Sequence, residues 1–206
     1  LPSVIKKFKN DQNFVATAVT MPYKLEVTKY VKFGDKISKF SNSINLIVKV
    51  NGNDILGFNT DVLGAIETVK KFKKKNIMIF GLGGTGKAIL KVFSRIYKSS
   101  KFIIVSSKKH KEFFENKKIK QRSCILEQDL KKIDLFINCS PIGSNLKKKF
   151  LNKSPISSEQ ILYLKKNVTI FDLVYKPLNT ELSKICKKRK RKYIKGLKMN
   201  TFQANK

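Results

Sequence analysis

A glycine motif, Gly81-x-Gly83-x-x-Gly86, is the first place in this sequence where residue types and spacing suggest chemistry. It follows the apolar run 77–80 and precedes a stretch in which apolar residues recur at helical spacing. Between a buried strand and an amphipathic helix, such glycines bind the pyrophosphate of a dinucleotide, with the phosphate at the helix N-terminus. A glycine turn that binds no ligand is the alternative.

The end of the next strand, 102–105, predicts which dinucleotide is bound. It continues into Ser106, Ser107 and Lys108, and the first carboxylate after them belongs to Glu112. An acidic residue at the strand end would bind the ribose 2′-hydroxyl of NAD. Hydroxyls and cations suit the 2′-phosphate of NADP better, so the sequence predicts NADP.

A lysine and an aspartate, each just beyond a predicted strand, are the other candidates. Lys24 ends the segment Thr-Met-Pro-Tyr-Lys, and Asp61 ends the segment Gly-Phe-Asn-Thr-Asp. Strand ends commonly present functional side chains. Each residue also has a plainer interpretation, Lys24 as one more solvated lysine and Asp61 as the N-cap of the following helix.

Strands and helices that alternate along the chain must position these residues. A strand at 14–20 stops at Pro22, and 43–50 pairs with 54–58 as a β-hairpin around an Asn-Gly-Asn turn. A helix over 62–72 follows, with its apolar residues on one face. Further strands are predicted at 77–80, 102–105, 124–126, 135–138 and 168–171, with a short one at 193–194. This alternation implies an α/β fold with a parallel sheet.

The composition excludes several classes of protein. The chain has 206 residues and 41% hydrophobic content, enough for one substantial core or two small ones. Its apolar runs are far shorter than the roughly 20 residues of a membrane-spanning helix, and nothing resembles a signal peptide. We therefore expect a cytoplasmic protein without a membrane partner. Three widely spaced cysteines and a single histidine predict reduced thiols and no metal site.

The formal net charge of +31 would ordinarily suggest a nucleic-acid or anionic-membrane partner. Only four of the 45 basic residues are arginines, however, whereas surfaces that read nucleic-acid sequence favour arginine. Lysine, asparagine, isoleucine and phenylalanine are abundant, as expected of a coding sequence rich in A and T. We therefore attribute most of the charge to compositional bias and expect no nucleic-acid partner, with a basic nucleic-acid-binding protein as the alternative.

Six segments in collinear order resemble the shikimate dehydrogenase family. They are V-T-M-P-Y-K at 19–24, G-F-N-T-D at 57–61, G-L-G-G-T-G at 81–86, N-C-S-P-I-G at 138–143, D-L-V-Y-K-P-L-N-T at 172–180 and G-L-K-M-N-T-F-Q-A at 196–204. The resemblance implies a truncated N-terminal α/β substrate-binding domain at 1–61, a linking helix at 62–75, a Rossmann-like NADP-binding domain with a parallel sheet at 76–195, and the start of a C-terminal helix that returns to the substrate domain at 196–206.

The resemblance also implies reduction of 3-dehydroshikimate to shikimate by NADPH, a step of aromatic amino-acid (chorismate) biosynthesis, in a cleft between the two domains. Lys24 and Asp61 would be the catalytic pair. Hydride transfer to a ketone leaves an alkoxide, which a charged amine can stabilise and protonate while a carboxylate orients that amine. Substrate contacts would come from Thr20, Asn45, Tyr175 and Gln203. Cofactor contacts would come from Gly81, Gly83, Gly84, Thr85, Gly86, Ser140 and Gly196, in addition to Ser106, Ser107 and Lys108.

The sequence departs from the family pattern in several places. The family's S-x-S-P segment, which holds the substrate carboxylate, has no match before Phe14, the chain opens with Leu1, and it ends three residues after Gln203. Ser107 stands where the family has a phosphate-binding arginine. A weakened or fragmentary relative is therefore an alternative function, and the sequence leaves quinate acceptance and a homodimer open.

Overall fold

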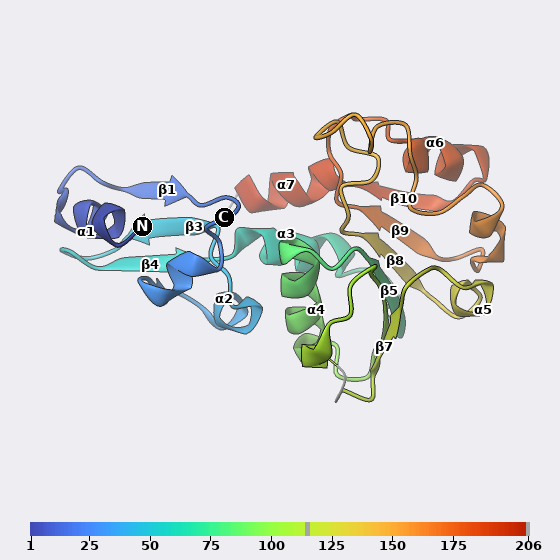
Figure 1. Cartoon of the computed structure of the whole chain (residues 1–206), viewed down its shortest axis with the longest axis horizontal. Helices are drawn as coiled ribbons and strands as arrows, with labels where there is room; N and C mark the ends of the chain where they lie inside the picture. Colours follow the sequence, from blue (N-terminus) through green and yellow to red (C-terminus); the bar gives the residue numbers. More distant parts are fainter. Residues whose placement is uncertain (114–115, 205–206) are drawn as a thin grey trace.

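The computed structural model describes residues 1–113 and 116–204, without the side chains of Gln203 and Ala204. Two β-sheets lie at opposite ends of an elongated molecule, the first built from residues before Asn59 and the second from the chain after it (Figure 1). Helices α3 (Thr60–Val69) and α7 (Gly196–Ala204) lie between the two sheets.

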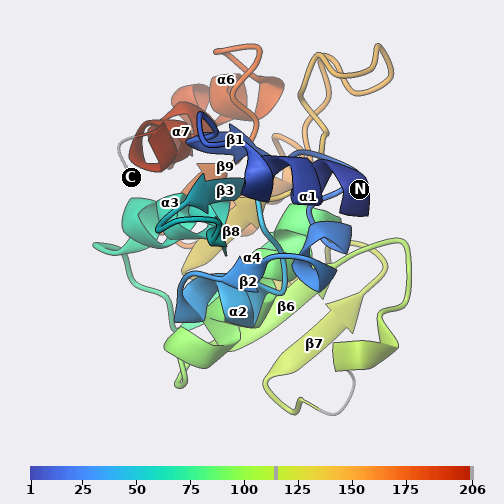
Figure 2. The same ribbon diagram turned by 90° about the vertical axis from the view of Figure 1, so that its left-hand side faces the viewer.

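The first sheet has four strands in the order β1 (Ala16–Ala18), β3 (Leu46–Lys49), β4 (Ile55–Phe58) and β2 (Lys32–Phe33). The antiparallel pairing of β3 with β4 confirms the predicted hairpin. In its turn Gly52 has a φ of 55°, a left-handed conformation that glycine adopts without steric cost. Three helices lie beside this sheet: α1 (Pro2–Asn10), the short helix η1 (Glu26–Lys29) and α2 (Lys36–Ser41) (Figure 2).

The second sheet is parallel throughout its six strands. Their order is β7 (Ile119–Arg122), β6 (Lys101–Val105), β5 (Asn76–Phe80), β8 (Leu135–Asn138), β9 (Thr169–Asp172) and β10 (Lys192–Lys195). Numbered as the chain enters them, the strands run 3-2-1-4-5-6, the order of a dinucleotide-binding doubly wound fold. The order reverses between β5 and β8, and ligands of such folds bind beyond the carboxyl ends of the strands at that point.

Helices cover both faces of this sheet. Ile77 and Ile79 on β5 pack in one core with α3, α7 and α4 (Gly84–Ile96), whereas Met78 between them packs in a second core on the opposite face. The second core includes residues of α5 (Glu127–Leu130), the short helix η3 (Gln160–Tyr163) and α6 (Glu181–Lys188). Because both faces are covered, the central strands are apolar on both sides and appear in the sequence as short continuous apolar runs.

One predicted strand is wrong. Residues 124–126 form a loop that leads into α5, and the strand of this region is β7, a few residues earlier. β7 is the outermost strand and contains Lys120, Gln121 and Arg122, so it has no apolar run that could have marked it in the sequence. Ile125 is apolar because it packs against the second core from the loop.

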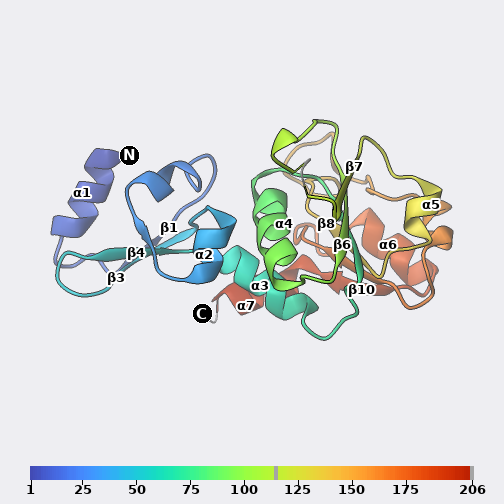
Figure 3. The ribbon, with the colours of Figure 1, turned by 90° about the horizontal axis from the view of Figure 1, so that it is seen from below.

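Helices α3 and α7 run side by side between the two sheets (Figures 1 and 3). A Cβ atom on Gly64 of α3 would lie 2.7 Å from the carbonyl oxygen of Met199 on α7, so the two backbones approach each other closely. α3 begins directly after β4 and leads toward β5. It packs in the same core as α4, the helix that begins within the glycine motif. Within the described residues, no helix has the length and apolar character needed to cross a membrane.

Candidate active site

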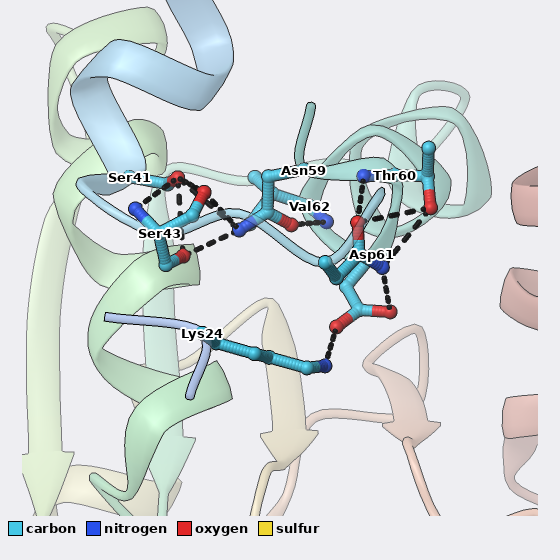
Figure 4. Close-up of polar contacts among 8 residues, drawn as sticks. Lys24, Ser41, Ser43, Asn59, Thr60, Asp61 and Val62 are labelled. Atoms are coloured by element: carbon cyan, nitrogen blue, oxygen red, sulfur yellow. Dashed lines mark hydrogen bonds and ion pairs between the residues drawn. The ribbon is translucent and has the colours of Figure 1, made fainter. Parts of the chain in front are cut away.

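Lys24 and Asp61 form an ion pair, although 37 positions separate them in the chain. Lys24 lies in the turn region that follows β1, and Asp61 lies in the first turn of α3. Lys24 Nζ is 2.6 Å from Asp61 Oδ2 (Figure 4). Their side chains are 26% and 13% exposed, so both are mostly shielded from solvent yet still accessible to a small molecule. The structure therefore brings together the two residues that the sequence proposed as a pair.

Asn45 holds the other oxygen of the Asp61 carboxylate. Asn45 Nδ2 donates to Asp61 Oδ1 at 2.9 Å and to Thr60 Oγ1 at 3.0 Å, and Asn45 Oδ1 accepts from Thr60 N at 2.8 Å. Asn45 is only 4% exposed. Its amide thus orients the aspartate, and the substrate contact that the resemblance implies for Asn45 stays a prediction.

The N-cap of α3 is Asn59, which leaves the Asp61 carboxylate free to pair with Lys24. Asn59 Oδ1 accepts from Val62 N at 3.0 Å. Its Nδ2 donates to Ser43 Oγ at 2.5 Å and also reaches Ser41 Oγ at 3.2 Å (Figure 4). The start of α3 is therefore tied to the segment before β3, and Asn59 caps the helix instead of Asp61, so the plainer interpretation of Asp61 as the N-cap is wrong.

A cavity of about 890 Å³ lies beyond the carboxyl ends of the central strands, at the point where the strand order reverses. The glycine turn after β5 lines it, and so does Ser140, which follows β8 and lies against Gly81. Its further lining includes Phe80, Leu82, Val105, Ser123, Cys124, Ile125, Pro141, Ile142, Phe150, Pro155 and Gln160. The position and size of this cavity suit a dinucleotide.

The three glycines of the motif have different surroundings. Gly81 has a φ of 89°, and a Cβ there would lie 2.7 Å from the Cβ of Ser140. A Cβ on Gly86 would collide with the carbonyl oxygen of Gly81, so this glycine lets α4 pack against the turn. A Cβ on Gly83 would meet no protein atom within 4 Å. Gly83 and Gly84 therefore present bare backbone to the cavity, as close approach of a pyrophosphate requires.

At the end of β6, all three residues predicted to contact the 2′-phosphate, Ser106, Ser107 and Lys108, line this cavity. Lys87 and His110 line it as well, and sequence reasoning missed both. Lys87 directly follows the third glycine, a position in the first turn of α4 that could have marked it.

Polar contacts connect the groups at this end of the cavity. Ser106 Oγ and His110 Nε2 are 3.1 Å apart, and Lys87 Nζ donates to Glu112 Oε1 at 2.9 Å. The hydrogen bond from Lys87 lowers the pKa of Glu112. Lysine, histidine and hydroxyl groups thus gather where the ribose of a dinucleotide bound to the glycine turn would lie.

A smaller cavity of about 220 Å³ contains the ion pair. Lys24 and Asp61 line it together with Thr85 of the glycine segment. Leu25 and Gly84 line both cavities, so the two spaces are neighbours. A ligand in the smaller cavity would therefore contact the ion pair and lie next to a ligand in the larger one. Its remaining lining residues are Met21, Pro22, Ser43, Asn59 and Ala88.

Some predicted site residues lie apart from both cavities. Thr20 and Tyr175 are exposed and line neither cavity. Gly196, at the start of α7, is buried, and a Cβ there would collide with the carbonyl oxygen of Leu173, so it permits close packing on the end of β9. The side chain of Gln203 lies outside the described residues. In the part of the chain that the structure covers, no group of three His, Cys, Asp or Glu side chains could hold a metal ion.

Two proteins whose sequences resemble this chain are both named shikimate dehydrogenase (NADP(+)). No protein-family model matches it. The shikimate dehydrogenase (NADP(+)) of Methanocaldococcus jannaschii is 31% identical over 201 residues, which cover 90% of this chain and 68% of that protein. The chain belongs to the shikimate dehydrogenase family. The enzyme of the same name from Methanococcus vannielii is also 31% identical, over 205 residues that cover 90% of this chain and 68% of that enzyme.

Solved structures of the shikimate dehydrogenase family share the fold. A crystal structure of shikimate dehydrogenase in complex with NADP+ has a TM-score of 0.77 and 28% identity, covering 98% of this chain and 74% of that one. Quinate dehydrogenase from Corynebacterium glutamicum, in complex with NAD, has a TM-score of 0.81 at 19% identity, covering 99% of this chain and 74% of that one. At that level of identity the likeness shows the fold alone.

Proposed function

We propose that this chain reduces 3-dehydroshikimate to shikimate with NADPH, a step of aromatic amino-acid biosynthesis. The observation that carries the proposal is the Lys24–Asp61 ion pair, which lines a small cavity next to the larger cavity of the glycine turn. Two ligands in neighbouring spaces, one of them in contact with an ammonium group, suit hydride transfer to a carbonyl carbon.

Lys24 would protonate the substrate oxygen. When hydride reaches the carbonyl carbon, the C=O π electrons move to oxygen and leave an alkoxide, and the Lys24 ammonium stabilises this charge and transfers one proton to it. The products are the alcohol and a neutral amine, which regains its proton from water. The pairing distance of 2.6 Å to Asp61 supports this role, because the carboxylate fixes the position of the Lys24 ammonium group in the cavity.

Asp61 would orient Lys24, and Asn45 would orient Asp61. Each carboxylate oxygen of Asp61 has its own donor, Lys24 Nζ on Oδ2 and Asn45 Nδ2 on Oδ1, so the carboxyl plane cannot rotate without losing a hydrogen bond. The substrate contacts that the resemblance implies for Thr20, Asn45, Tyr175 and Gln203 remain part of this proposal.

The chain's own residues fit a bound NADPH, which supplies the hydride. The backbone of Gly83 and Gly84 would bind its pyrophosphate at the N-terminus of α4, where free N–H groups favour anions. Ser106, Ser107 and Lys108 would bind the 2′-phosphate, and Ser140, next to Gly81, would contact the nicotinamide half. Thr85 lines the smaller cavity, so it would lie where cofactor and substrate meet.

A spectrophotometric assay tests the reaction. Purified protein mixed with NADPH should lose absorbance from the reduced cofactor only after 3-dehydroshikimate is added, and the product should co-elute with shikimate. The reverse reaction, with shikimate and NADP+, should restore the absorbance. Protein that binds NADPH yet gives no turnover in either direction would contradict the proposed reaction.

Lys108 should decide the preference for NADPH over NADH. Replacement by methionine keeps the apolar stem and removes the charge, so the KM for NADPH should rise about tenfold, as expected for a lost charge-assisted hydrogen bond of roughly 1.5 kcal/mol. The KM for NADH, which has no 2′-phosphate, should stay unchanged. Lys109→Met is the matched control, because Lys109 is exposed and does not line the cavity. Equal effects of both variants on NADPH would argue for a general charge effect.

A further inference from the structure

The carboxylate of Asp172, at the carboxyl end of β9, is fully buried and accepts four hydrogen bonds. Asn138 Nδ2 donates to its Oδ1 at 2.9 Å and Val174 N does so at 3.1 Å. Thr180 Oγ1 and Tyr193 OH each donate to Oδ2 at 2.9 Å. Burial raises the pKa of Asp172. A buried carboxylate is retained at a cost that its partners have to offset, and the proposed reaction does not use this one.

The Oδ1 side of Asp172 leads to the wall of the larger cavity. Asn138, which is held by Oδ1, accepts hydrogen bonds on its own Oδ1 from Ser140 N at 3.1 Å and from Ser140 Oγ at 2.7 Å. Asn138 Nδ2 also reaches the carbonyl oxygen of Ile142 at 3.2 Å. Ser140 and Ile142 line the cavity, and Ser140 lies directly against Gly81 of the glycine turn.

The Oδ2 side of Asp172 leads away from that cavity. Thr180 is the N-cap of α6 and accepts from Ser183 N at 3.2 Å, while Tyr193 belongs to the outer strand β10. Neither Thr180 nor Tyr193 lines either cavity. Oδ1 of Asp172 is thus connected through Asn138 to the cavity wall, whereas Oδ2 is bonded to the start of α6 and to β10, which do not line the cavity.

We infer that Asp172 is a positioning residue for the cofactor: through Oδ1 and Asn138 it holds the Ser140–Ile142 segment against the glycine turn, in the shape that a bound dinucleotide requires. Without the Oδ1 contact, Asn138 Nδ2 keeps only its longer hydrogen bond to the carbonyl oxygen of Ile142, so the amide and its two hydrogen bonds to Ser140 are less firmly oriented. The inference rests on the proposed function to the extent that the larger cavity binds NADP.

The test compares variants on the two sides of the carboxylate, with the Kd of NADP+ measured by titration calorimetry on the full chain. Asn138→Ala and Asp172→Ala should each raise the Kd about tenfold, and the double variant should raise it no further, because both remove the same connection. Tyr193→Phe removes one donor to Oδ2, so it should lower the urea midpoint of unfolding and leave the Kd unchanged. If Asp172→Ala fails to fold, the Kd values of Asn138→Ala and Tyr193→Phe still compare the Oδ1 side of the carboxylate with its Oδ2 side.

Asp172→Asn provides a rescue that a purely structural role does not predict. An asparagine whose Oδ1 keeps the original position still accepts from Asn138, and its amide can donate to Thr180 and Tyr193 because hydroxyl groups also accept. Its Kd for NADP+ should therefore stay near that of the unchanged protein. A Kd raised equally by Tyr193→Phe and Asn138→Ala, or additive effects of Asn138→Ala and Asp172→Ala, would overturn the inference. Unchanged protein that binds NADP+ without turnover would count against the reaction alone, whereas protein that does not bind NADP+ would overturn both.

Discussion

Replacement of Lys24 by alanine should lower kcat for 3-dehydroshikimate reduction by about 10²- to 10⁴-fold, the range that a positioned general acid contributes. The Kd of NADPH should not change, because Lys24 lines the smaller cavity and not the larger one. The fold should survive, since Asp61 is partly exposed and keeps the hydrogen bond from Asn45 after the lysine is lost. Steady-state kinetics and calorimetric titration with NADPH measure the two effects separately.

Two further variants sharpen this prediction. Lys29→Ala removes a lysine from η1 that lines neither cavity, so it should leave kcat unchanged and exclude a general effect of charge. Asp61→Asn keeps the size of the side chain and removes the negative charge that orients the amine, so it should lower kcat without a comparable loss of NADPH binding. If Lys24→Ala retained full turnover, the proton would have to come from another group and the proposed role of Lys24 would be wrong.

Gly83→Ala should abolish most cofactor binding in a protein that remains folded. Gly83 has φ −71° and ψ −169°, an extended conformation open to any residue, and an added Cβ would meet no protein atom within 4 Å. That methyl group would instead occupy the space that the pyrophosphate needs. A crowding cost of about 1–3 kcal/mol corresponds to a Kd for NADP+ raised about 5- to 150-fold. The urea midpoint should change little, because two effects offset each other: alanine is a poorer N-cap than glycine, but it also restricts the unfolded chain at a position whose backbone angles it can adopt.

Gly86→Ala is the matched variant, three positions along the same segment, and its effect should be of the opposite kind. There the new Cβ would collide with the carbonyl oxygen of Gly81 and lie 3.2 Å from the Cβ of Cys139, so the start of α4 must move away from the sheet. We expect a loss of about 1–3 kcal/mol in the free energy of unfolding, measured by urea denaturation. Equal stability losses in the two variants would mean that Gly83 is constrained by the protein itself and not by a ligand.

The sequence by itself determined the class of fold and the place of the cofactor turn. Short apolar runs alternating with helical periodicity indicated a parallel sheet, because strands covered on both faces need apolar side chains on both. The Asn-Gly-Asn turn marked the hairpin, since few residues other than glycine and asparagine take a left-handed conformation cheaply. β7 could not be predicted from the sequence, because an edge strand with polar side chains has no continuous apolar run.

Only the tertiary structure decided how the site is assembled. Local patterns cannot show that Lys24 and Asp61 meet, because their pairing depends on how the loop after β1 and the start of α3 pack across the first sheet. In the same way, packing brings Asn45 into hydrogen-bonding distance of Asp61. Because Asn59 is the N-cap of α3, the Asp61 carboxylate is free to bind Lys24. Spacing along a chain records which neighbours share a helix face or a strand face, whereas contacts between distant segments arise only when the elements have packed into a core.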